Sequence, residues 1–130
     1  MIECPAHLLY SQRHLWVDVE DEEKSIAKVG ITQYHQEGLG EIQSADLPLV
    51  GDELEIDVPC AHLHIEDELH HLLAPLTGRV ESINRDVLDN PALLHIDPYQ
   101  HWLFRMEFDE PDEFELLLSP EQYIRVAESL

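Results

Sequence analysis

Short runs of alternating apolar and polar positions dominate the chain and predict a protein built mainly of β-strands. Leu15–Val19 and Ser25–Ile31 are two such runs, and a charged stretch over residues 20–24 separates them. Two β-rich runs around a charged turn are typical of a β-hairpin. Residues 54–58 alternate apolar and acidic side chains, which favours a half-buried strand. Further strands are expected over residues 41–47, 60–65, 69–73, 79–83 and 102–108.

Helix signals occur at two places between the predicted strands. Thr32 is suited to cap the N-terminus of a short helix, and Gly40 is suited to end it. Asn90 followed by Pro91 indicates a cap and a first-turn proline, which predicts a second short helix through Leu94.

A third helix is expected at the C-terminus. Ser119, Pro120 and Gln122 combine an N-cap, a first-turn proline and the glutamine of a capping box. The whole pattern is many short strands with frequent turns and a few short helices. It favours a single domain over residues 1–130, folded as a β-sandwich or flattened barrel with peripheral helices.

The charge of the chain is its strongest compositional feature. Seven Lys and Arg against 28 Asp and Glu give a formal net charge of −21. Such a field repels phosphates and anionic membrane surfaces, which argues against nucleic acid and membranes as partners. No apolar run is long enough to span a bilayer and the N-terminus lacks signal-peptide character, so a cytoplasmic location is expected. Without CxxC spacing, Cys4 and Cys60 are expected to be free thiols.

Many short motifs in register make the chain resemble the glycine cleavage H-protein family from about Tyr10 to the C-terminal helix. The resemblance implies a mainly β, lipoyl-type (barrel-sandwich hybrid) fold with short peripheral helices and a C-terminal helix. H-proteins carry lipoate on a lysine at a hairpin tip and shuttle an aminomethyl group between enzymes, so the family is one of carriers rather than catalysts. The motifs that carry the resemblance are Tyr10-Ser11, His14, Trp16-Val17, Gly30-Ile31-Thr32, Leu39-Gly40, Leu47-Pro48, Val50-Gly51-Asp52, Ala74-Pro75, Asp97-Pro98-Tyr99 and Trp102-Leu103.

The lysine of the family is missing. The segment that resembles Glu-Ser-Val-Lys-Ala places Asp67 at the lysine and His64 at the glutamate. Lipoylation forms an amide with a nucleophilic amine, which an aspartate lacks. Lys24 and Lys28 are the only lysines in the sequence, and neither is expected at such a tip. The sequence therefore predicts that lipoate is not attached at Asp67.

The replacement hairpin is rich in histidine. If residues 66–69 form a four-residue turn, Ile65 pairs with His70 and His64 pairs with His71. One face then carries three imidazoles near a carboxylate, which suits Zn²⁺ or another divalent metal. Two alternatives are a solvated polar hairpin without a ligand and a pH-responsive surface. The predicted metal-ligand set is His62, His64, His71 and Glu66, with His70 on the opposite face.

Three functions are consistent with the sequence. The leading hypothesis is a non-catalytic H-protein-like module that binds a protein, such as a component of the glycine-cleavage or lipoate machinery. The second is a divalent-metal-binding protein on the same scaffold. The third is a glycine-cleavage carrier modified at another lysine.

Overall fold

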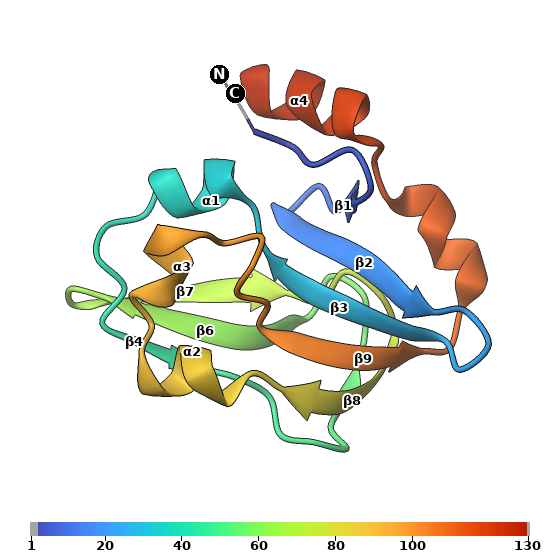
Figure 1. The fold of residues 1–130 in the computed structure, drawn as a ribbon, viewed down its shortest axis with the longest axis horizontal. Helices are drawn as coiled ribbons and strands as arrows, with labels where there is room; N and C mark the ends of the chain where they lie inside the picture. The colour runs from blue at the N-terminus through green and yellow to red at the C-terminus, as the bar shows by residue number, and fades with distance from the viewer. Residues whose placement is uncertain (1–2, 130) are drawn as a thin grey trace.

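The computed structural model describes residues 3–129, and two antiparallel β-sheets form its framework (Figure 1). The larger sheet has six strands in the order β1-β2-β3-β9-β8-β5, and the smaller sheet has three in the order β4-β6-β7. The strands are β1 Leu9–Tyr10, β2 Leu15–Asp21, β3 Ile26–Ile31, β4 Ser44–Asp46, β5 Glu53–Leu54, β6 Pro59–Ile65, β7 Glu68–Leu73, β8 Gly78–Ile83 and β9 Phe104–Phe108.

Short helices lie around the two sheets (Figure 1). The helix α1 lies near the N-terminal end of β2, and α4 lies above β1. The helices are α1 Gln33–Glu37, α2 Arg85–Asp89, α3 Leu93–Ile96, the 3₁₀ helix η1 Pro111–Leu116 and α4 Pro120–Glu128. No helix in residues 3–129 is long and apolar enough to cross a membrane.

One apolar core joins the two sheets. Val17 and Val29 of the larger sheet and Leu63 and Leu72 of the smaller sheet are each at most 1% exposed. Removing one such side chain from water contributes about 1.5–3 kcal/mol. Because both sheets give side chains to this core, the hairpin β6–β7 is fixed against the larger sheet.

A smaller apolar cluster fixes α4. Tyr123 of α4 has no exposed surface, and its ring stacks on Tyr10 with centroids 4.9 Å apart. Leu8 and Trp16 complete the buried part of this cluster. The C-terminal helix therefore brings the Tyr123 hydroxyl to the turn between β1 and β2.

Several sequence predictions are confirmed. The β-sandwich with short helices is present, and the N-terminal hairpin forms as β2 and β3 with Val17 opposite Val29. Ser119 and Gln122 form both bonds of the predicted capping box in α4. Cys4 and Cys60 are free.

Two predicted strands are shorter than expected. In the segment 41–47 only β4 is strand, and in the segment 54–58 only Leu54 continues the short strand β5. The chain turns after β5, and Asp57 has a positive φ of 64°. Alternation of apolar and polar residues indicates that every second side chain is buried. A turn that packs on the edge of the core can bury alternate side chains in the same way, so the pattern did not distinguish it from a strand.

Two helix boundaries were wrong. Thr32 caps α1 as predicted, but the helix ends at Gly38 instead of Gly40. Asn90 is the C-cap of α2, an unpredicted helix whose N-cap is Asn84. The following helix α3 begins after Ala92 without a side-chain cap.

Candidate functional site

The hairpin β6–β7 ends in a two-residue turn, Glu66-Asp67. Ile65 pairs with Glu68, and His62 pairs with His71. The predicted four-residue turn and its pairs are therefore wrong. Glu66 has a positive φ of 55°, and positive φ is typical of such tight turns. The slip is two residues, so strand alternation is unchanged, and His62, His64 and His71 share one face.

Asp67 is exposed at the tip, so the hairpin presents a carboxylate where lipoate attachment requires an amine. Lys24 is exposed in the β2–β3 turn. This turn lies at the opposite end of the molecule from the tip of β6–β7 (Figure 1). Lys28 lies within β3, and its Nζ is 3.6 Å from the Glu20 carboxylate. The residues at the tip do not fit covalent lipoate.

The outer face of the hairpin holds the predicted metal set in two separate pairs. His62 Nδ1 and His71 Nδ1 are 2.8 Å apart. His64 Nε2 is 2.7 Å from the Asp46 carboxylate on β4. Glu66 lies at the exposed turn. Within residues 3–129 no three His, Cys, Asp or Glu side chains are arranged to hold a metal ion.

His70 projects from the opposite face and meets α1. Its Nε2 is 2.8 Å from Nε2 of His35. The Nδ1 of His35 is buried and has no hydrogen-bond partner among the described residues. Because orphaned buried N–H groups are rare, we assign the His35 proton to Nε2, which donates it to His70. A neutral His70 then carries its own proton on Nδ1.

Two buried hydroxyls orient the ring of His14. The Tyr123 hydroxyl is 2.8 Å from both Thr32 Oγ1 and His14 Nδ1. Thr32 Oγ1 also accepts the backbone N–H of His35, and neither hydroxyl has another acceptor among the described residues. We therefore assign the direction that leaves neither buried hydroxyl proton unpaired, in which Thr32 donates to Tyr123. Tyr123 in turn donates to Nδ1 of His14. The neutral ring of His14 therefore carries its proton on Nε2.

Burial keeps these three histidines neutral at pH 7. It lowers the pKa of His35 to about 3, and the nearby His70 and His14 act in the same direction. Burial and the Arg13 guanidinium lower the pKa of His14. Burial and His71 lower the pKa of His70, against a smaller opposite effect of Glu68. The three rings therefore act as neutral hydrogen-bonding groups.

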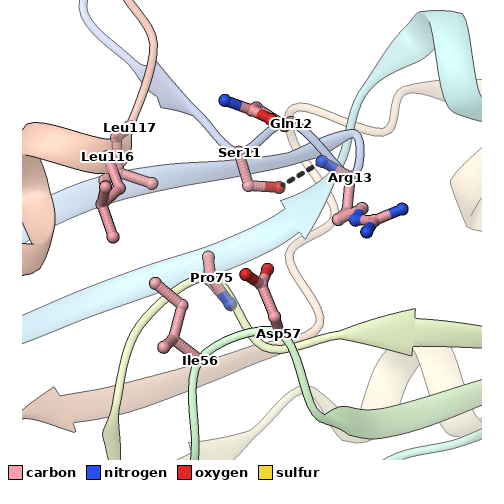
Figure 2. A pocket seen from close by; sticks show the side chains of 8 residues that line it. All are labelled: Ser11, Gln12, Arg13, Ile56, Asp57, Pro75, Leu116 and Leu117. Carbon is pink, nitrogen blue, oxygen red and sulfur yellow. Dashed lines mark hydrogen bonds between the residues drawn. The ribbon is translucent and has the colours of Figure 1, made fainter.

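The turn between β1 and β2 positions this histidine cluster, which consists of His14, His35 and His70. Ser11 Oγ accepts the backbone N–H groups of Arg13 and Leu15 at 3.2 and 3.1 Å. His14 has a positive φ of 70° in the same turn. A pocket of about 260 Å³ is lined by residues of this turn. Figure 2 shows Asp57 below Ser11, with the Arg13 guanidinium directed away from both.

Two further hollows adjoin this turn, and both are lined by all three histidines of the cluster. One has a volume of about 380 Å³ and continues to Tyr34, Glu37 and Leu39. The other has a volume of about 530 Å³ and is lined also by Arg13. The cluster therefore forms a shared wall of a concave surface beside the hairpin.

Most of this cluster could not be found from the sequence. His14 is part of the family resemblance, and alternation along β7 places His70 on the inner face. Nothing in the sequence connects His70 to His35 or His14 to Tyr123. The first pair is separated by 35 residues and the second by 109 residues. Only the packing of α1 and α4 brings them together.

The two facing sheets, the peripheral helices and the projecting hairpin define a lipoyl-type β-sandwich. A profile of the glycine cleavage H-protein matches residues 8–130. The chain belongs to the glycine cleavage H-protein family.

Relatives of known name cover nearly the whole chain. The glycine cleavage system H protein of Psychrobacter sp. (strain PRwf-1) is 39% identical over 124 residues, which are 95% of this chain and 97% of the relative. That of Oceanobacillus iheyensis is 38% identical over 123 residues, or 94% and 95% of the two chains. The crystal structure of a glycine cleavage system H protein from Mycobacterium marinum superposes with a TM-score of 0.82, at 26% identity, and covers 98% of this chain and 100% of that one.

Proposed function

We propose that this chain is a non-catalytic H-protein-like module that binds a protein partner and is not lipoylated at the usual hairpin position. The observation that carries the proposal is the exposed Asp67 at the tip of β6–β7, in a fold that otherwise matches the family. A carboxylate cannot form the amide that attaches lipoate. Such a module keeps the recognition surface of the family without the carrier chemistry.

The charge of the chain supports the choice of partner. A net charge of −21 favours a basic protein surface and fast, salt-dependent association. Components of the glycine-cleavage or lipoate machinery are the first partners to test, because relatives across the whole length are named as proteins of that system. The cytoplasmic location expected from the sequence is part of this proposal.

Intact-mass measurement tests the loss of modification. The chain is coexpressed with a lipoate ligase and lipoate, beside the variants Asp67→Lys and Glu66→Lys. We expect no lipoyl adduct on the unchanged chain and an adduct on Asp67→Lys. Glu66→Lys is the matched control, because it places an amine at the adjacent turn position. A lipoyl adduct on Lys24 or Lys28 of the unchanged chain would instead support the carrier modified elsewhere.

Capture experiments test the partner. The immobilised protein is exposed separately to each purified glycine-cleavage and lipoate-attachment component at low and at physiological salt. Retention of one component that weakens as salt rises is the expected result. If every component passes through under both conditions, a partner from this machinery is ruled out.

A divalent-metal site on the outer hairpin face is the second candidate function. The 2.8 Å separation of His62 Nδ1 and His71 Nδ1 supports it, because two imidazoles so close can turn toward one ion. Titration with Zn²⁺ should show binding that the double variant His62→Ala, His71→Ala loses. The matched control His64→Ala should bind Zn²⁺ with an affinity close to that of the unchanged chain, since His64 faces Asp46 and not the His62–His71 pair. Equal affinity of the double variant and the unchanged chain would exclude this site.

A further inference from the structure

The larger hollow beside the hairpin differs in charge from the rest of the protein. The sequence contains 28 acidic residues, yet none of the described residues that line this hollow is acidic. Arg13 and the histidine cluster line it instead. The adjoining smaller hollow has one acid, Glu37. A strongly acidic chain thus has a concave surface furnished with hydrogen-bond donors.

The hydrogen-bond network leaves a free ring N–H donor on two of the histidines that line this surface. His14 carries its proton on Nε2, because Nδ1 accepts from Tyr123. His70 carries its proton on Nδ1, because Nε2 accepts from His35. Neither of these two N–H groups has a hydrogen-bond partner within residues 3–129. The Arg13 guanidinium adds a positive charge close enough to lower the pKa of His14.

Apolar side chains line the remainder of the hollows. Leu73 and Val126 contribute to the larger one, and Leu39 contributes to the smaller one. The volumes of about 530 and 380 Å³ are within the range of sites for small organic molecules. A donor set beside an apolar wall suits a molecule with an anionic head and a short apolar chain.

We propose that Arg13, His14 and His70 bind the carboxylate of a small aliphatic acid whose chain lies along Leu73 and Val126. The guanidinium and the two imidazole N–H groups donate to the carboxylate oxygens. A metal ion is the poorer occupant, because binding it would break the His35–His70 and His14–Tyr123 hydrogen bonds. The negative field of the whole chain opposes an anion, but salt screens charges beyond about 8 Å at 0.15 M ionic strength, whereas the donors act in contact.

Titration of the whole chain with sodium hexanoate, followed by calorimetry and NMR in 0.15 M salt, tests this site. Saturable binding with a Kd of about 1 mM or below is expected. Hexylammonium chloride has the same chain and the opposite charge, and it should not bind. Inorganic phosphate should bind more weakly than hexanoate, because it has no chain for the apolar wall.

Variants locate the binding. Arg13→Gln and His70→Phe should each weaken hexanoate by about tenfold or more, since each removes a donor to a charged group. Arg85→Gln makes the same charge change at an exposed position on α2, outside the hollows, and should bind as the unchanged chain does. Arg13 is also exposed, so folding of its variant is not at risk.

The proposal is overturned by any of three results. One is no saturation at hexanoate concentrations of about 10 mM. Another is equal binding of hexylammonium or of phosphate. The last is an Arg13→Gln variant that binds hexanoate as tightly as Arg85→Gln does.

Discussion

Protonation of His35 should destabilise the fold between pH 7.5 and pH 5.5. The pKa of His35 is about 3 in the folded chain, against 6.5 as its ordinary value. Below pH 6.5 the unfolded chain therefore binds a proton at His35 that the folded chain does not bind. By linkage, the contribution of His35 to the free energy of unfolding is fully present above the unfolded pKa and is lost as the pH drops toward 3. For this one group the loss between pH 7.5 and 5.5 is about 1.4 kcal/mol.

The variant His35→Gln isolates this contribution. Glutamine keeps an N–H donor near the position of Nε2 but does not titrate, so it removes the proton uptake while leaving the other ionisable groups unchanged. Urea unfolding of both proteins at the two pH values, followed by tryptophan fluorescence, gives four free energies of unfolding. The unchanged chain should lose about 1.4 kcal/mol more than the variant on acidification.

An equal loss in both proteins would refute the reasoning, because it would mean that His35 titrates alike in the folded and unfolded chains. A smaller difference would place the pKa of His35 closer to its ordinary value. The chemical shift of the His35 ring protons across the same pH range provides an independent check on the folded state.

Three further substitutions test the packing and the buried bonds by urea unfolding. Gly78→Ala should cost about 3 kcal/mol or more, because its Cβ would lie 2.0 Å from the Glu107 carbonyl oxygen. The control Gly38→Ala, with Cβ contacts no closer than 3.6 Å, should change stability by less than about 1 kcal/mol. Equal effects of the two substitutions would contradict the clash at Gly78. Tyr123→Phe should cost about 1–3 kcal/mol, since it leaves buried partners unsatisfied; a neutral result would count against the assigned hydrogen-bond relay. Ser119→Ala should cost about 1 kcal/mol through the lost cap of α4, and unchanged stability would show that the capping box contributes nothing.

Local signals in the sequence predicted the elements whose stability is local. The cap at Thr32, the capping box at Ser119 and the hairpin of β2 and β3 all formed where expected. Predictions that depended on exact lengths were less accurate. The turn at Glu66-Asp67 is two residues shorter than expected, because Glu66 adopts a left-handed conformation that the sequence does not signal for a glutamate.

The sequence alone determined the chemistry at position 67. Whether an amine is present is a property of the residue itself, so the proposal that lipoate is not attached at this position rests on Asp67 without any structure. Alternation along a strand likewise separated His70 from His62, His64 and His71, because a register change of two residues preserves the faces.

The tertiary structure alone decided what His70 does. Its ring lies on the inner face of the hairpin and contacts His35 of α1, while α4 brings Tyr123 to His14. These contacts and burial set the pKa values and the proton positions of the cluster. They depend on burial and on atoms that are distant in the sequence. Hydrogen bonding and desolvation act over a few ångströms in space, so no local pattern in the chain contains them.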